Sequence, residues 1–233
     1  EPLTNTVDML KLKGSYGKVG NDDIGGQRRW VYESSIVSGG SWNYGSDGGN
    51  GGGGIRIGEI ENLSASWEEA LKLNVGIEFS LFRKLKVQAD YFREERTGIF
   101  LQRAGLPAIV GLSSIPYVNV GETLNQGIDA NIEYSQQVGK VLLTARGNFT
   151  YNRNELVNND EPDWQYKYQN RTGKPFGSNG ALQPFGLVAL GLFQSQEEID
   201  NSPEQTYGEY RVGDIKYQDV NGDGKVDDQD MVA

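Results

Sequence analysis

The most regular pattern in this chain is the stretch ALKLNVGIEFSLF, residues 70–82. From Leu71 to Leu81 every second residue is apolar, and the residues between them are polar or small. This period-two alternation predicts a β-strand with one apolar face and one polar face. The alternation covers 11 residues, whereas an ordinary strand has about 5–6. At about 3.3 Å per residue and a tilt of about 45°, the strand would rise about 25 Å, the height of the apolar band of an outer-membrane barrel.

The same alternation recurs along the chain. It predicts further strands near 8–18, 84–95, 126–135, 140–152 and 184–194. Some neighbouring strands are joined by short turns, and the others by long connections over 19–69 and 95–125. We therefore predict an all-β fold, an antiparallel segment of a large transmembrane β-barrel with short periplasmic turns and long extracellular loops. Alternating strands also occur in β-sandwiches and soluble barrels, where the apolar face covers a core.

Composition narrows the possible functions. The chain has 233 residues, no Cys, no His and a formal net charge of −10. Catalysis by a thiolate or an imidazole is excluded, as are zinc sites built from Cys and His. A strongly acidic chain repels a phosphate backbone, so we expect no nucleic-acid partner. No run approaches the roughly 18 apolar residues of a transmembrane helix. No other catalytic constellation stands out, and we do not expect an enzyme.

The stretch DVNGDGKVDDQD, residues 219–230, has the spacing of a calcium-binding loop. Such a loop places oxygen ligands at positions 1, 3, 5, 7, 9 and 12 and a glycine at position 6, which is Gly224 here. The candidate metal ligands are Asp219, Asn221, Asp223, the backbone carbonyl of Lys225, Asp227 and Asp230. We expect Ca²⁺ to order residues 213–233. The alternative is a solvated turn, because Asn-Gly and Asp-Gly are strong turn formers without any ion.

Aromatic residues in the long loops are candidate substrate contacts. Their rings could stack on the faces of sugars. The candidates are Trp42, Tyr44, Trp164, Tyr166 and Tyr168. The alternative for each ring is packing within its own loop. The glycine-rich segment 38–54, which contains the first two rings, lacks the pattern of a phosphate-binding loop.

An ordered series of short motifs resembles the late barrel region of SusC-like TonB-dependent outer-membrane transporters. The motifs are LKGSYG (12–17), GND (20–22), WE (67–68), DYF (90–92), PYVNVG (116–121), NQGID (125–129), FTYN (149–152), GLF (191–193) and GDIKYQDVNGDG (213–224). Each motif alone is weak, but their order holds over nearly the whole chain.

The resemblance implies a closed barrel of about 22 strands around an N-terminal plug. It implies import of oligosaccharides or peptides through the outer membrane of a Gram-negative bacterium, driven through TonB, with a SusD-like surface lipoprotein as lid. It also implies contact with outer-membrane lipid. We therefore expect residues 1–233 to be one partial barrel domain, a fragment without the plug and the remaining strands. The alternative is a secreted, calcium-stabilised β-sandwich that binds carbohydrate or mediates adhesion. A glycan-active hydrolase is a third possibility, for which no catalytic residues are found.

Overall fold

The chain separates into two units, residues 1–160 and residues 161–233, and each is described by itself. The computed structural model describes residues 6–23, 30–45, 48, 50–177, 182 and 184–233. Strands dominate, and α1 (Gln196–Asp200) has only five residues. Within the described residues, no helix is long and apolar enough to cross a membrane. The predicted all-β, antiparallel class is confirmed, and the expectation of one partial barrel domain over residues 1–233 stays a prediction.

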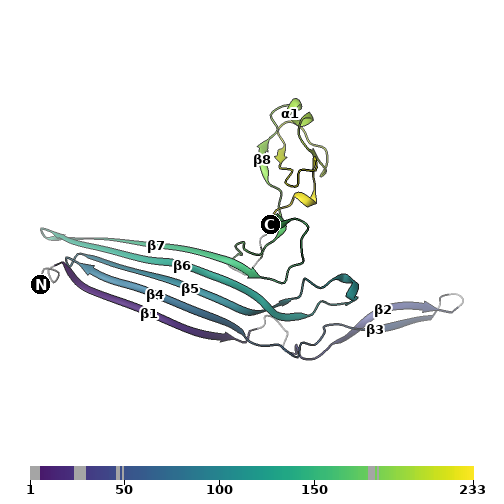
Figure 1. Ribbon diagram of the computed structural model, residues 1–233, viewed down its shortest axis with the longest axis horizontal. Coiled ribbons are helices and arrows are strands. Elements are labelled where there is room, and N and C mark those ends of the chain that lie inside the picture. The colour runs from purple at the N-terminus through teal and green to yellow at the C-terminus, as the bar shows by residue number, and fades with distance from the viewer. Residues whose placement is uncertain (1–5, 24–29, 46–47, 49, 178–181, 183) are drawn as a thin grey trace. The chain divides into compact units, whose positions relative to one another are not determined.

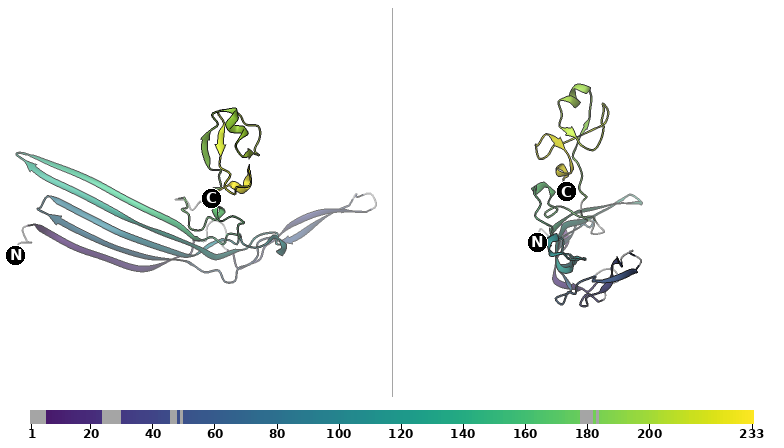
Figure 2. Two further views of the ribbon diagram at one scale, coloured as in Figure 1. Left: turned by 45° about the horizontal axis from the view of Figure 1, so that its top comes forward. Right: turned by 90° about the vertical axis from the view of Figure 1, so that its right-hand side faces the viewer.

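One antiparallel sheet of five strands runs through the first unit in the order β1-β4-β5-β6-β7 (Figure 1). The strands are β1 (Val7–Asn21), β4 (Glu68–Leu81), β5 (Leu85–Gln102), β6 (Tyr117–Val138) and β7 (Val141–Asn158). Figure 2 shows the same strands side by side from a second direction. The connection expected over 95–125 is shorter, because β5 continues to Gln102 and β6 begins at Tyr117. Register shifts around Ile99 break the alternation there, so the sequence pattern hides these strand ends.

The register aligns apolar residues of all five strands in rows. Leu12 pairs with Ile77, Ile77 with Ala89, Ala89 with Ala130, and Ala130 with Phe149. Two flanking rows are Gly14, Val75, Tyr91, Ile128 and Tyr151, and Leu10, Phe79, Val87, Ile132 and Gly147. Paired residues point to the same side of a sheet, so these rows form one surface, the apolar face. Leu12 is 76% exposed and Phe149 is 61% exposed, so the described residues leave this face largely uncovered.

The opposite surface of the sheet, the polar face, carries ion pairs between neighbouring strands. Nζ of Lys13 lies 3.0 Å from Oδ1 of Asp90, and Nζ of Lys72 lies 3.1 Å from Oε2 of Glu94. Further pairs join Lys11 to Glu78, Lys86 and Arg146 to Glu133, and Arg96 to Glu68 and Glu94. Pairs that remain partly exposed contribute little to stability, at most about 1 kcal/mol each. Their main effect is to make this face hydrophilic along its length.

The connections between strands differ in length at the two ends of the sheet. At one end, residues 82–84 join β4 to β5, and Gly139 with Lys140 joins β6 to β7. Gly139 has a φ of 65°, which glycine adopts readily at the first position of a two-residue hairpin turn. At the other end, residues 103–116 join β5 to β6. The connection from β1 to β4 contains a separate hairpin of β2 (Ile36–Tyr44) and β3 (Asn50–Ile57).

The second unit is built from short elements around a small core. β8 (Ala189–Leu192) pairs with β10 (Ile215–Tyr217), and β9 (Glu204–Gln205) pairs in parallel with β11 (Lys225–Val226). Phe193 is 1% exposed and Val226 is 0% exposed, and both belong to this core. The barrel strand predicted near 184–194 is therefore wrong in length and in partner. Only four of its residues form a strand, and they pair with the nearby β10 instead of the large sheet.

Candidate functional site

The loop 219–230 is held by hydrogen bonds from its side chains to its own backbone. The Asp219 carboxylate accepts the N–H of Gly222 at 2.6 Å and that of Gly224 at 2.9 Å. Oδ1 of Asn221 accepts the N–H of Asp223 at 2.9 Å. The two glycines have φ values of 77° and 89°, a left-handed backbone that residues with a Cβ rarely adopt. The side chains at loop positions 1 and 3 are therefore fixed in tight turns.

Asp230, at position 12, is the centre of these hydrogen bonds. It is 0% exposed. Its Oδ1 accepts the N–H of Val220 at 2.8 Å and that of Asn221 at 3.1 Å, and its Oδ2 accepts the N–H of Asp227 at 3.0 Å. The Asp227 side chain in turn accepts the N–H of Gln229 at 2.7 Å, and Asp227 and Asp230 together form a capping box around the 3₁₀ turn 228–230. The Asp230 carboxylate thus ties the beginning of the loop to its end.

The loop supplies the right kind of donors for a hard cation. Oxygens stand at each ligand position of the calcium pattern, and a carboxylate oxygen that accepts one N–H keeps a second lone-pair direction. Asp230 is the most heavily engaged of these residues, because its Oδ1 already accepts two N–H groups and its Oδ2 accepts a third. Across the described residues, which include all of 219–230, no three acidic side chains are gathered into a metal-binding cluster. Binding of a cation would have to draw the carboxylates together.

Tyr166 and Tyr168, two of the predicted substrate contacts, lie against this loop. Their rings stack with centroids 5.2 Å apart and planes at 11°. The Tyr166 hydroxyl donates to Oε1 of Gln229 at 3.1 Å, and the Tyr168 hydroxyl donates to the Gln229 carbonyl at 2.6 Å. Burial raises the pKa of Tyr168, and the negative charge of Asp230 raises it further. Both rings therefore support the position of the loop.

Trp164, a third predicted contact, is held within its own segment. Its Nε1 donates to Oε2 of Glu161 at 3.3 Å, and its ring meets Phe185 edge-on at 5.2 Å. The Arg171 guanidinium lies 4.2 Å from the centroid of the Phe185 ring. Burial pushes the pKa of Glu161 upward, but hydrogen bonds from the Thr172 hydroxyl and from the backbone N–H groups of Arg171 and Thr172 outweigh it. The pKa of Glu161 is therefore lower than usual, and the carboxylate stays charged.

Trp42 and Tyr44 stand on β2 in the first unit and remain open to solvent. They are 58% and 55% exposed. A Cβ added to Gly54 would lie 2.9 Å from Cζ3 of Trp42, and one added to Gly52 would lie 3.4 Å from the Tyr44 ring. The glycines of β3 thus let both rings approach the opposite strand closely. These two rings are the predicted contacts that a ligand could reach directly.

One feature of the second unit was not predicted from the sequence. Tyr207, Tyr210 and Tyr217 line a groove together with Glu209 and Asp214. These residues have neither helical nor strand periodicity. Folding of the segment between β9 and β10 brings them together. The only sequence signal for the groove is therefore the high local content of tyrosine and acidic residues over 207–217.

Comparisons with known proteins agree on one family. The model of the family described as "TonB dependent receptor-like, beta-barrel" matches residues 5–228. The chain is 27% identical over 252 residues to TonB-dependent receptor P39 of Formosa agariphila, covering 95% of this chain and 23% of that protein. It is 25% identical over 238 residues to receptor P26 of the same organism, with 98% and 23% covered.

Solved structures show the same fold. The RagAB peptide importer in its open-open state matches with a TM-score of 0.65 at 18% identity, over 98% of this chain and 23% of that chain. The closed-closed state matches with a TM-score of 0.61 at 21% identity over the same shares. At these identities the likeness concerns the fold alone. The chain spans about a quarter of the length of the relatives it matches.

Proposed function

Because the chain belongs to the TonB-dependent receptor-like β-barrel family, we propose that its five-stranded sheet is part of the wall of an outer-membrane importer. Membership confirms the expected resemblance to SusC-like transporters. TonB-dependent receptors are transporters rather than enzymes, which agrees with the expectation drawn from composition. The proposal places the protein in the outer membrane of a Gram-negative bacterium.

The observation that carries the proposal is the uncovered apolar face. Its central row crosses all five strands and contains no charged residue. The row consists of Leu12, Ile77, Ala89, Ala130 and Phe149. Lipid would cover this face in a barrel wall, and the ion-paired polar face would line the interior. The 11 residues from Leu71 to Leu81 would rise about 25 Å at a tilt of about 45°, the height of the apolar band of known barrels.

Three tyrosines lie among the apolar rows. Tyr91 and Tyr151 flank Ile128 in one row, and Tyr134 pairs with Leu85 on the other side of the central row. Six residues of β4 separate these two rows, a rise of about 14 Å, so the tyrosines lie inside the proposed band rather than at its two interfaces. Their apolar rings fit this position, and the apolar rows carry the placement.

Connection lengths give the proposed orientation. Outer-membrane barrels have short turns on the periplasmic side and longer loops outside the cell. The turns at 82–84 and 139–140 would then be periplasmic, and the connections over 22–67 and 103–116 extracellular. The second unit, which follows β7, would also begin on the extracellular side.

The edges of the sheet indicate that the barrel needs more strands than this chain provides. β1 and β7 are its outer strands, and the sheet does not close on itself. An unpaired strand edge cannot face hydrocarbon, because its N–H and C=O groups would have no partner. We infer that further strands of the whole protein pair with β1 and β7. A β-sandwich would instead need a second sheet, whereas the other sheets of the described residues have two strands each.

The substrate and the partners of the whole protein follow from the relatives as proposals. The related RagAB structures are described as a peptide importer. We propose that this protein imports peptides or oligosaccharides with a SusD-like surface lipoprotein, and that TonB supplies the energy. The exposed rings of Trp42 and Tyr44 would contact substrate on the extracellular side, since aromatic faces stack on sugars and on peptide side chains.

Import by living cells tests this proposal. Cells that lack the full-length protein should lose uptake of a labelled peptide or oligosaccharide from a mixed library, and cells that lack TonB should lose the same uptake. Restoring the gene should restore it. Unchanged uptake of every library member in both strains would contradict the proposal.

We propose separately that the loop 219–230 binds Ca²⁺. Asp219, Asn221, Asp223, the Lys225 carbonyl and Asp227 would ligate the ion, and Asp230 would either rearrange or keep its backbone contacts. Added Ca²⁺ should slow hydrogen exchange and proteolysis over residues 213–233, and Asp223→Asn should weaken this response. Protection that is the same with Ca²⁺ and with a chelator would exclude the site.

A further inference from the structure

The groove of the second unit has the composition of a binding site for a cation on an organic chain. It is an open groove of about 300 Å³, lined by Tyr207, Glu209, Tyr210, Asp214, Ile215 and Tyr217 among others. Three phenol rings and two carboxylates thus meet around one hollow. None of the lining residues is basic.

The walls of the groove are fixed from behind. The Tyr210 ring stacks on Phe193, which is 1% exposed, with centroids 5.5 Å apart and planes at 22°. The buried side chain of Gln205 donates to the Ile215 carbonyl at 3.2 Å and accepts the N–H of Tyr217 at 2.8 Å. These contacts join the two sides of the groove, so its shape exists before any ligand arrives.

The polar groups at the groove divide into occupied and available ones. The Tyr207 hydroxyl donates to Oδ1 of Asp228 at 2.9 Å, and the Tyr210 hydroxyl accepts the N–H of Gln205 at 3.4 Å. Both hydroxyls are engaged, one face of the Tyr210 ring is covered by Phe193, and Oδ2 of Asp214 accepts the N–H of Arg211 at 2.8 Å. A carboxylate keeps further lone pairs beside one such bond, so Asp214 can also accept from a ligand. The Glu209 side chain is exposed, and its carboxylate can accept hydrogen bonds from a ligand.

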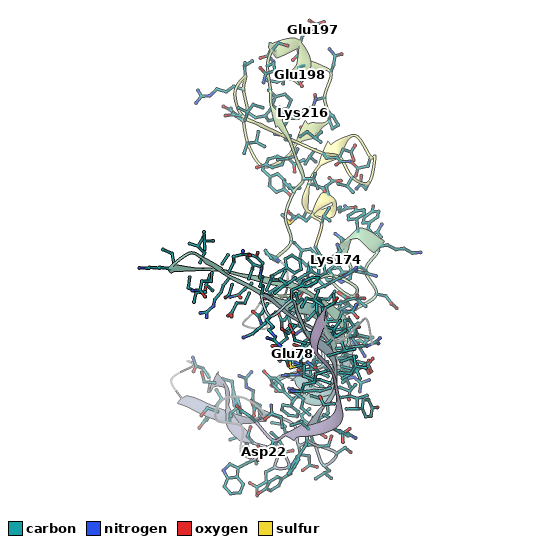
Figure 3. The ribbon with its side chains drawn as sticks, turned by 90° about the vertical axis from the view of Figure 1, so that its left-hand side faces the viewer. Asp22, Glu78, Lys174, Glu197, Glu198 and Lys216 are labelled. Carbon is teal, nitrogen blue, oxygen red and sulfur yellow. The ribbon has the colours of Figure 1, made fainter. Side chains whose placement is uncertain are left out.

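The charge of the second unit selects the sign of the ligand. Residues 161–233 carry 13 acidic and 6 basic side chains, a net charge of −7. Lys216, which neighbours Tyr217, is already paired with Glu198 at 2.9 Å, and Figure 3 shows these two side chains in the second unit. Acidic groups beside aromatic faces attract a cation through the ring quadrupole and through direct charge pairing. A neutral sugar would use the rings but gain nothing from the charge.

We propose that this groove binds a lysine or arginine side chain of a peptide. The cationic head pairs with Glu209 and Asp214, and the aliphatic stem lies along Tyr207, Tyr217 and Ile215. This inference concerns binding to the second unit itself. It can be measured without transport, so its failure would leave the proposed import function standing.

The test uses the full-length receptor in detergent and a blocked pentapeptide with one arginine among glycines. The matched peptide carries citrulline, which has nearly the same shape as arginine and no charge. Calorimetry should show binding of the arginine peptide about 5- to 30-fold tighter than binding of the citrulline peptide. Raising the salt concentration should lower the affinity for the arginine peptide and leave the affinity for the citrulline peptide unchanged.

Two pairs of variants locate the binding. Glu209→Gln should lower the affinity for the arginine peptide about 3- to 5-fold. Glu197→Gln, which removes one exposed charge of the same unit outside the groove, should leave this affinity unchanged. Tyr217→Leu should lower the affinity, and Tyr207→Phe, which keeps the aromatic ring, should leave it unchanged. Equal affinity for both peptides, equal losses from both glutamine variants, absence of peptide binding, or binding of a maltooligosaccharide alone would each overturn the proposal.

Discussion

Replacing Ile77 by arginine should destabilise the protein in a lipid bilayer by about 2–4 kcal/mol, which is the cost of a cationic side chain at the bilayer midplane. Ile77 lies in the central row of the apolar face, between Leu12 and Ala89. On a barrel wall its side chain would point into hydrocarbon. The change corresponds to a loss of about 30- to 900-fold in the folding equilibrium.

The same substitution at Leu71 provides a depth control. Leu71 is on the same strand and the same face, six residues from Ile77. At about 3.3 Å per residue and a tilt of about 45°, it lies about 14 Å from the level of Ile77. Its row contains Lys18 and Glu95, as expected at a polar interface. Leu71→Arg should therefore cost only about 0–1 kcal/mol.

The assay is urea titration of the full-length receptor folded into phospholipid vesicles, with the folded fraction followed by tryptophan fluorescence and protease resistance. Glu78→Gln, next to Ile77 on the polar face, should change the midpoint little, because its pair with Lys11 is long and partly exposed. Equal destabilisation by Ile77→Arg and Leu71→Arg would refute the reasoning, since a membrane imposes a depth dependence.

Three further predictions concern the second unit. Asp230→Ala should leave three backbone N–H groups without their acceptor and destabilise the unit by about 3 kcal/mol or more, compared with about 1 kcal/mol for the exposed Asp223→Ala, as measured by hydrogen exchange over 213–233. A hydrogen bond from the Gln194 N–H and then one from Lys216 lower the pKa of Glu198 below its ordinary 4.5. The charged Glu198 side chain therefore stabilises the folded unit above pH 4.5, and this stabilisation is lost as the pH falls through the lowered pKa. Hydrogen exchange over 189–217 followed against pH should show this loss in the original protein and not in Glu198→Gln. Burial and then the hydrogen bond to Asp228 raise the pKa of Tyr207 to about 12. The protonated Tyr207 hydroxyl therefore contributes to stability below about pH 10, and this contribution is lost as the pH rises through about 12. Difference absorbance against Tyr207→Phe should show that this tyrosine ionises late.

Strands of the large sheet were predictable because their side chains face two different environments. A face toward lipid and a face toward a hydrated interior impose period-two alternation on every strand, and β4 shows it from Leu71 to Leu81. The pattern fails where pairing becomes irregular, as around Ile99. The sequence therefore predicts the end of β5 too early, near residue 95, and the start of β6 too late, near residue 126. The hairpin of β2 and β3 was hidden by glycines, which leave no alternation to detect.

The second unit resisted prediction because its contacts are local and irregular. Its strands have two to four residues, too few for a periodic signal. The spacing of Asp219, Asn221 and Asp223 identified the loop, but not that Asp230 would bind backbone N–H groups. The sequence predicts Tyr166 and Tyr168 as substrate contacts because it shows an aromatic ring without showing its neighbour, which is Gln229 in each case.

The central claim is that the apolar face meets lipid and the polar face meets water. Ile128 and Asp129 are consecutive residues on opposite faces of β6, and the chain contains no cysteine. Each should be replaced in turn by a cysteine carrying a nitroxide, in the full-length receptor in bilayers, with any other cysteine changed to serine. Collision rates with oxygen, which concentrates in lipid, and with a water-soluble nickel complex then report the two environments. The account predicts that the label at 128 meets oxygen and the label at 129 meets nickel. A label at 128 that meets nickel, or that is shielded from both as in a packed core, would contradict it.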